Sequence, residues 1–177
     1  MSSQRVQLIG CSGAGKTTLG RELAHQLDAP FVDLDDLYWE PGWVGVGHGE
    51  LARRLAATLA QPSWVIAGNY TATTEREVWP HLTRLVVLDL PLPLLMLRSA
   101  RRTLRRIVSG EMCCNGNRET LRHALGRDAP LRYTLRVWKA RHARYAGLAA
   151  HPALVHAEVV HLKSDDEVRH WRQQWPR

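Results

Sequence analysis

The sequence predicts an α/β protein in which helices cover a five-stranded parallel β-sheet. Short apolar runs alternate along the chain with longer segments of helical periodicity, an order typical of a parallel sheet. A glycine-rich loop follows the first apolar run and leads directly into a helical segment. The chain has 177 residues, of which 45% are hydrophobic, and this is enough for a core. We therefore expect residues 1–177 to form a single domain.

Each expected strand is a short run of apolar or nearly apolar residues, and the runs cover 6–9, 31–34, 64–67, 85–88 and 159–162. The expected helices cover 16–27, 49–59, 93–108, 129–149 and 165–175. A proline at the start of the third helix suits a first helical turn. Residues 109–127 lack a clear periodicity and contain asparagines, glycines and charges, so we expect a mobile lid there.

The loop after the first strand matches the phosphate-binding pattern G-x-x-x-x-G-K-[ST] at every fixed position, from Gly10 to Thr17. Glycines let consecutive backbone N–H groups point inward, and the following helix adds the positive end of its dipole. We expect Lys16 to reach the outer phosphates of ATP and the Thr17 hydroxyl to bind Mg²⁺. The residues expected to bind the nucleotide are Gly10, Ser12, Gly13, Ala14, Gly15, Lys16, Thr17 and Thr18.

Three aspartates lie at or just beyond the end of the second expected strand, at the sheet edge where open parallel sheets bind ligands. Asp33 and Asp35 are two apart on an extended segment, so both side chains can lie on one face. Near a phosphate loop, one carboxylate can hold Mg²⁺ and another can accept a proton from an attacking hydroxyl. We expect Asp33 to serve the metal and Asp35 to serve catalysis and the acceptor. Asp36 is expected to cap a short helix.

Four arginines recur on one face of the third helix, at Arg98, Arg101, Arg102 and Arg105. Like charges stacked in this way repel one another, and a bound anion relieves the repulsion. In phosphoryl transfer an arginine stabilises the transferring group. We expect Arg101 and Arg105 to be catalytic, without distinguishing which of them acts. The alternative is a solvated basic face whose arginines pair with acids elsewhere.

Aromatic side chains cluster after the second strand, at Tyr38, Trp39 and Trp43, and can wall a substrate pocket or stack on a base. A hydrophobic staple beneath a loop is the competing interpretation. The triplet 68–70 follows the third strand and offers hydrogen bonds from its asparagine and its tyrosine, although such triplets are also ordinary turn material. The residues expected to contact the substrate are Asp35, Tyr38, Trp43, Asn69 and, in the expected lid, Arg118.

The chain carries 24 Lys and Arg against 17 Asp and Glu, a net charge of +7, so we expect an anionic partner. Phosphorylated metabolites, nucleic acid and acidic membrane surfaces all qualify, although the sequence contains no recognised DNA-reading module. The longest apolar stretch, 85–97, is interrupted by an aspartate and two prolines and does not predict a membrane span. The three cysteines show neither disulfide nor zinc spacing, which favours a reduced, cytoplasmic protein.

Taken together, these motifs resemble the small P-loop kinases that include adenylate kinase and shikimate kinase. The most similar group is the adenylate kinase-like proteins, also called DNA topology-modulation (FlaR-type) proteins. The resemblance spans nearly the whole chain and rests on the arginine helix and on the blocks 10–18, 34–39, 41–43, 68–70, 88–91 and 115–119. It implies a three-layer P-loop NTPase fold with the loop strand at the centre of the sheet, a closing lid, and binding of ATP and Mg²⁺.

The resemblance also implies roles for individual residues. Asp33 and Asp35 resemble the acidic pair of shikimate kinase, and the residues that match its lid-side arginines are Arg101, Arg102, Arg105 and Arg118. The chain departs from the family pattern at Ala67, where relatives often have an acid. If that acid helps to hold Mg²⁺, Asp33 and Asp35 must carry this task alone.

Our leading hypothesis is an ATP-dependent phosphotransferase that acts on a small-molecule acceptor. The first alternative is an ATP-binding regulatory protein that associates with nucleic acid and has little or no kinase activity. The basic charge favours this alternative, but charge alone supports only nonspecific, salt-sensitive binding. A nucleoside monophosphate kinase is the second alternative, although we find no base-reading signature.

Overall fold

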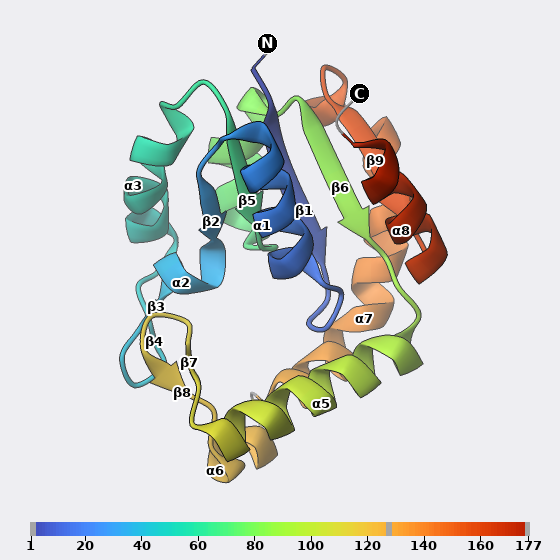
Figure 1. Ribbon diagram of the computed structural model, residues 1–177. Coiled ribbons are helices and arrows are strands. Elements are labelled where there is room, and N and C mark those ends of the chain that lie inside the picture. The colour runs from blue at the N-terminus through green and yellow to red at the C-terminus, as the bar shows by residue number, and fades with distance from the viewer. Residues whose placement is uncertain (1–2, 127–128, 176–177) are drawn as a thin grey trace.

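A five-stranded parallel sheet forms the centre of the computed structural model, which describes residues 3–126 and 129–175 (Figure 1). The strands are β1 (Arg5–Gly10), β2 (Phe31–Asp33), β5 (Trp64–Ala67), β6 (Arg84–Leu88) and β9 (Glu158–Leu162). Their order is β2-β5-β1-β6-β9, and every neighbouring pair is parallel. The loop strand β1 therefore lies at the centre of the sheet, and the predicted α/β fold is confirmed.

Helices cover both faces of this sheet. The α-helices are α1 (Lys16–Leu27), α2 (Leu34–Tyr38), α3 (His48–Leu59), α4 (Thr71–Thr73), α5 (Leu92–Ser109), α6 (Leu121–Leu125), α7 (Pro130–Ala146) and α8 (Asp165–Gln174). None of the helices in the described part of the chain is long and apolar enough to cross a membrane.

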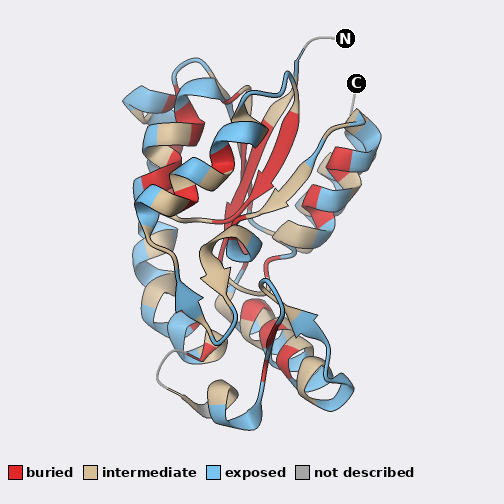
Figure 2. Ribbon diagram, turned by 90° about the vertical axis from the view of Figure 1, so that its left-hand side faces the viewer, coloured by how far each residue is buried: buried red, intermediate tan, exposed pale blue. Residues whose placement is uncertain are grey.

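The core consists of two layers, because successive strand residues point to opposite faces of the sheet. Leu85 and Val87 of β6 pack with residues of α3 on one face. Val86 and Leu88 pack with residues of α1 on the other face, where α8 also contributes. Figure 2 shows buried central strands flanked by less buried ones, with helices whose buried residues lie on the sides that face the sheet.

Two segments differ from the sequence-based expectation. The predicted helix over 129–149 ends at Ala146 and is followed by a separate 3₁₀ turn, Leu148–Ala150. Residues 71–81, for which no element was predicted, form α4, a π-helical turn (Thr74–Val78) and a 3₁₀ turn (Trp79–His81). The latter is held by the core, since the buried Trp79 indole donates to the Gln7 amide oxygen at 3.0 Å.

Two small hairpins lie beyond the carboxyl edge of the sheet. One contains β3 (Trp39–Glu40) and β4 (Val44–Gly45), and the other contains β7 (Met112–Cys113) and β8 (Asn117–Arg118). The buried Asn117 joins them, because its amide donates to the Glu40 carbonyl and accepts from the Trp43 amide, both at 2.9 Å. The second hairpin and α6 make up most of the predicted lid segment 109–127, of which residue 127 lies outside the described residues. That this segment opens and closes stays a prediction.

Candidate active site

The phosphate-binding loop joins β1 to α1 and faces α5 across the carboxyl end of the sheet (Figure 1). Gly13 and Gly15 have φ values of +85° and +92°, a region that side chains other than glycine rarely adopt. A Cβ on Gly13 would lie 2.6 Å from the Leu95 carbonyl oxygen of α5, whereas Gly15 faces open space. The loop therefore packs on one side against α5 and exposes its backbone on the other.

Lys16 lies within the loop and donates to the backbone carbonyls of Gly10 (3.0 Å) and Cys11 (3.2 Å). Burial lowers the pKa of Lys16, and although the nearby Asp35 and Asp33 carboxylates raise it, the net shift is downward. A buried ammonium group that is held mainly by carbonyls is a strong point of attraction for an anion, because an anionic partner offsets its desolvation.

Asp33 and Thr17 come together at the start of α1. The Thr17 hydroxyl donates to Asp33 Oδ2 at 2.7 Å, and Asp33 Oδ1 accepts from the backbone N–H of Asp35 at 3.1 Å. Burial raises the pKa of Asp33, and the neighbouring Asp35 carboxylate adds to the shift. These interactions make Asp33 the N-cap of α2. The expectation that Asp36 caps this helix is wrong, because the helix already begins at Leu34 and Asp36 lies within its first turn.

Asp35 is exposed and accepts a hydrogen bond from the Tyr70 hydroxyl at 2.6 Å. Burial raises the pKa of Tyr70, and the Asp35 carboxylate adds to this, so Tyr70 stays a hydrogen-bond donor at neutral pH. One oxygen of Asp35 is thus fixed by Tyr70, a residue that the sequence analysis did not select. Its only sequence signal was its place in the 68–70 block.

Ala67 is fully buried and pairs with Asp33 in the sheet register. No carboxylate therefore comes from this position, as the sequence indicated. The next polar residue, Asn69, turns to the phosphate loop: its side chain accepts from the Gly10 N–H (3.1 Å) and donates to the Gly10 carbonyl (2.8 Å). Tyr145 of α7 also donates to Asn69. These bonds hold the loop; substrate contact by Asn69 stays a prediction.

Among the arginines of α5, Arg102 is the one whose side chain contacts the loop. It donates to Ser12 Oγ at 2.8 Å, and its charge lowers the pKa of Lys16. Two other arginines pair with acids: Arg98 with Asp165 at 2.6 Å, in the wall of a cavity beside the loop, and Arg105 with Glu111 at 3.1 Å. Arg101 is exposed.

A second cationic group that the sequence analysis missed is Arg141 of α7, whose charge also lowers the pKa of Lys16. Its helix is fixed to the sheet edge by His142, which contacts the buried Asp89 at 2.8 Å. Nothing in the local sequence distinguishes Arg141 from the other arginines of α7. Catalytic roles for Arg101 and Arg105 stay predictions.

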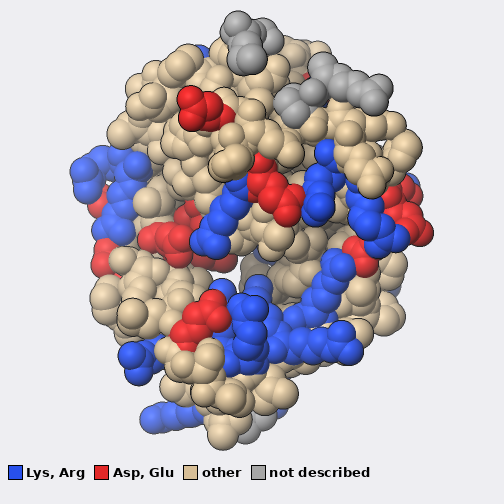
Figure 3. Space-filling view, viewed as in Figure 1, with Lys and Arg blue, Asp and Glu red and all other residues tan. Residues whose placement is uncertain are grey.

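The charges of the site divide across a hollow in the surface. Figure 3 shows Lys and Arg side chains gathered below this hollow, where α5 lies, and Asp and Glu side chains on its left rim. Such a distribution attracts an anion to the arginine side while leaving carboxylates free for a metal ion or a proton.

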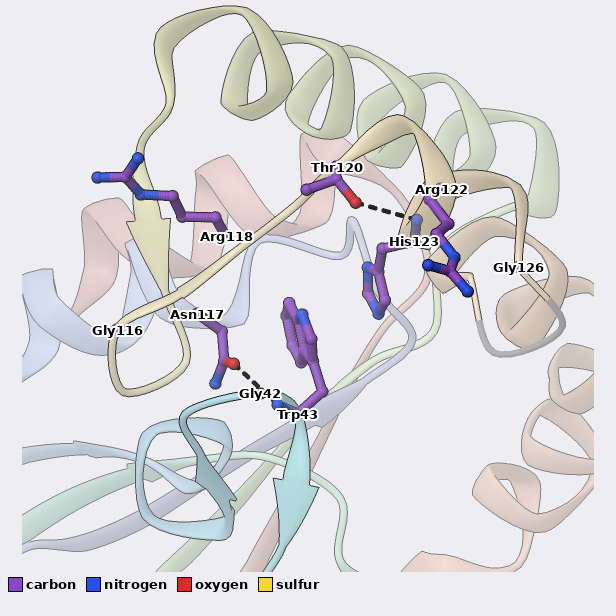
Figure 4. Close-up of a pocket in the computed structure, with 9 residues that line it drawn as sticks. All are labelled: Gly42, Trp43, Gly116, Asn117, Arg118, Thr120, Arg122, His123 and Gly126. Atoms are coloured by element: carbon purple, nitrogen blue, oxygen red, sulfur yellow. Dashed lines mark hydrogen bonds between the residues drawn. The ribbon is translucent and has the colours of Figure 1, made fainter.

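A cavity of about 660 Å³ lies between the two hairpins (Figure 4). Trp43 enters it from the β3–β4 turn and stacks on His123 of α6, with ring centroids 4.3 Å apart and planes within 8°. Arg118 also lines the cavity, but its guanidinium points away from this stack. The cavity is therefore walled by residues of the predicted substrate region and of the lid segment.

Tyr38 lies between this cavity and Asp35. Its ring packs on Tyr70 (centroids 4.6 Å apart) and on Trp39 (5.0 Å), and Trp39 in turn contacts Trp43. A continuous aromatic wall thus leads from the Asp35 carboxylate to the cavity. Of the predicted substrate residues, Asp35 and Tyr38 lie near one end of this wall, and Trp43 and Arg118 line the cavity at its other end.

A second cavity, of about 430 Å³, adjoins the phosphate loop itself. Gly13, Gly15 and Thr18 contribute to its wall, and Arg98 and Asp165 lie opposite. The nucleotide residues predicted from sequence therefore form one continuous loop with an open cavity beside it.

Comparison with known proteins finds similarity to shikimate kinases. The shikimate kinase family model matches residues 12–40, which hold the phosphate loop from Ser12 onward and the aspartate pair. Shikimate kinase of Psychrobacter cryohalolentis is 36% identical over 111 residues, which is 54% of this chain and 59% of that protein. Shikimate kinase of Bacteroides fragilis is 61% identical over 31 residues, 18% of this chain and 17% of that protein. The chain thus aligns with about three fifths or less of the length of these relatives.

Two solved structures resemble the whole chain. Shikimate kinase from Acinetobacter baumannii, in complex with shikimate, has a TM-score of 0.51 at 19% identity and covers 98% of this chain and 90% of its own. A candidate kinase from Chloroflexus aurantiacus has a TM-score of 0.53 at 16% identity and covers both chains fully. At these identities the likeness concerns the fold. The chain therefore combines a phosphate-loop sequence pattern with a fold similar to that of these two structures.

Proposed function

We propose that the protein is an ATP-dependent phosphotransferase that moves the γ-phosphoryl group of ATP to a small-molecule acceptor. One observation carries the proposal. Three groups converge at one edge of the sheet: the half-buried Lys16, the Thr17–Asp33 pair and the Asp35–Tyr70 pair. The Arg102 guanidinium contacts the same loop through Ser12. A loop that only binds a nucleotide would not require the Asp35–Tyr70 pair, in which a hydroxyl holds a carboxylate in place.

ATP fits this site for two reasons. The glycine-lined backbone of the loop offers N–H donors to phosphates, and the buried Lys16 ammonium gains a charged partner when they bind. The 430 Å³ cavity beside Gly13 and Gly15 is adjacent to the loop and offers room for the nucleoside. Arg98 and Asp165, which pair with each other in the wall of that cavity, would then flank the base.

Mg²⁺ would be held by Thr17 and Asp33, since a hydroxyl and a carboxylate oxygen supply the hard ligands that this ion prefers. The bound ion would neutralise charge on the phosphates. The raised pKa of Asp33 fits this role, because a carboxylate that is costly to ionise gains most from a cation beside it.

Asp35 would orient the acceptor hydroxyl and take its proton, while Tyr70 holds one carboxylate oxygen in place. Arg102 would stabilise charge on the transferred group, and closure of the lid segment would exclude water. The acceptor would enter along the aromatic wall from the 660 Å³ cavity. Shikimate is the first acceptor to test, because the family model and several relatives are shikimate kinases.

The test is ADP formation with ATP and Mg²⁺ against a panel of acceptors: shikimate, related polyols, sugars, nucleosides and nucleoside monophosphates. The proposal predicts that one class stimulates ADP release well above the rate without acceptor. Stimulation by monophosphates alone would favour the nucleotide kinase alternative. ADP release that no acceptor stimulates would overturn the proposal.

The second candidate, an ATP-binding regulator that associates with nucleic acid, is favoured by the net charge of +7 and by the exposed arginines of α5. It predicts that random duplex DNA binds at about 150 mM salt, near physiological ionic strength. Binding that is lost at this salt concentration would leave only nonspecific attraction and would remove this candidate.

A further inference from the structure

Two adjacent cysteines, Cys113 and Cys114, lie at the tip of the lid hairpin. Cys113 is the last residue of β7, and Cys114 begins the turn into β8. The turn is tight, because Cys114, Asn115 and Gly116 all have left-handed φ values, of 46°, 59° and 82°. The Asn117 amide fixes it by donating to the Cys114 carbonyl at 2.7 Å. Both cysteines are half-buried, whereas the third cysteine, Cys11, is only 2% exposed.

The two thiols face different parts of the site. They share a hydrogen bond, which lowers the pKa of Cys113 against the effect of its burial, and the Arg106 guanidinium lowers it further. The same bond raises the pKa of Cys114, and burial and the Asp35 carboxylate add to the rise. The Arg106 guanidinium thus favours the thiolate of Cys113, and the Asp35 carboxylate disfavours the thiolate of Cys114.

An ordinary disulfide does not suit this pair. Consecutive Cα atoms are about 3.8 Å apart across a trans peptide, and disulfides usually need about 4.4–6.8 Å. Two adjacent sulfurs can instead bind one shared atom, which closes a larger ring. Soft thiolate sulfur favours soft, thiophilic partners for such a bridge.

We propose that Cys113 and Cys114 form a dithiol site for arsenic(III) compounds that have two replaceable positions. In the reaction with an arsine oxide, the Cys113 sulfur attacks arsenic and the As=O bond gives up its electron pair to oxygen. The Cys114 sulfur forms the second As–S bond, and oxygen leaves as water with the two thiol protons. One arsine oxide and two thiols thus give one cyclic dithioarsinite and one water, with no change of oxidation state.

An arsenical at this position would lie close to Arg106 of α5 and to Asp35, whose charges act on the two thiols. It would also stiffen the turn whose Asn115 amide donates to the Trp39 carbonyl at 3.0 Å, so the lid hairpin could not adjust to an acceptor. We therefore expect it to block phosphoryl transfer. This consequence, unlike the binding itself, rests on the proposed function.

Phenylarsine oxide is the probe, and intact-protein mass spectrometry is the first readout. We expect one adduct per chain, equal in mass to the probe less one water, which 2,3-dimercaptopropanol removes and 2-mercaptoethanol does not. Two-point attachment should make the apparent affinity about 10²–10⁴-fold higher than that of a single thiol. Cys113→Ser and Cys114→Ser should each lose this gain, and Cys11→Ser, the matched control, should keep it.

An adduct that survives in either single variant of the pair, or that 2-mercaptoethanol removes with equal ease, would overturn the proposal. So would a mass loss of two hydrogens under mild oxidation with no arsenical capture, which would indicate a disulfide. A stable adduct that leaves acceptor-stimulated ADP formation unchanged would contradict the placement of the dithiol in the site. Because mass and activity are read separately, failure of the proposed function would not hide the result for the dithiol.

Discussion

Replacement of Arg102 by alanine is the most informative perturbation of the site. Its guanidinium donates to Ser12 Oγ over 2.8 Å and lowers the pKa of Lys16, so it touches both the loop and the charge that we expect to bind phosphate. If Arg102 only supports the loop, its loss removes one charged hydrogen bond, about 1.5–3 kcal/mol. At about 1.36 kcal/mol per tenfold change, this is roughly 10–150-fold in kcat/KM.

If Arg102 instead stabilises the transferring phosphoryl group, the expected loss is larger, about 10³–10⁵-fold. The assay is acceptor-stimulated ADP formation by Arg102→Ala, Arg101→Ala and Arg105→Ala, with thermal denaturation to show that each variant is folded. Arg132→Ala removes the same charge from an exposed position on α7 and serves as the control. We expect Arg102→Ala to lose at least about 10³-fold, and more than either neighbour. A loss of only about 10–150-fold, the size of one charged hydrogen bond, or a larger loss in Arg101→Ala or Arg105→Ala, would refute the catalytic role of Arg102.

Tyr70→Phe removes the hydrogen-bond donor to Asp35. We expect kcat to fall about tenfold, the equivalent of one hydrogen bond, while the KM for ATP stays unchanged. A change confined to the KM for ATP would be evidence against a positioning role. Asp33→Asn removes a carboxylate whose pKa is raised by burial, so without nucleotide and metal its Tm should exceed that of the wild type at pH 7. The gain should vanish as the pH falls below the ordinary carboxyl pKa of 3.8, where the wild-type group is protonated, and a pH-independent difference would contradict the cause. Glu119→Ala leaves the half-buried Arg106 guanidinium without its partner at 2.9 Å. Urea unfolding should show that the free energy of unfolding falls by about 3 kcal/mol. A fall below about 1 kcal/mol, typical of a surface ion pair, would contradict this.

The fold follows from local sequence to a large extent. Strand, loop and helix from Arg5 to Leu27 form as the glycine spacing and apolar pattern predict, and the remaining sheet strands lie within about two residues of their predicted bounds. The segment 71–81 was not predicted because its helical turns depend on a tertiary contact. Trp79 is held by the buried amide of Gln7, more than seventy residues earlier in the chain.

The site was predictable where the chemistry lies in one short motif and less so where it depends on packing. Periodicity placed Arg101, Arg102 and Arg105 on one helix, but only the close packing of α5 against Gly13 selects Arg102 for the loop. In the same way, Asp33 rather than Asp36 caps α2, because β2 ends at Asp33 and α2 begins at the next residue, Leu34. The Tyr70–Asp35 bond joins segments 35 residues apart and has no signal in either segment alone.

The central claim is that this chain transfers phosphoryl groups, and the most direct test follows the phosphorus itself. ATP labelled in its γ-phosphoryl group would be incubated with Mg²⁺ and the stimulating acceptor, with wild-type protein and with Lys16→Ala. The account predicts label on the acceptor with the wild type and none above background with the variant, which should remain folded. Label that appears only in inorganic phosphate, or equal transfer by Lys16→Ala, would contradict the account.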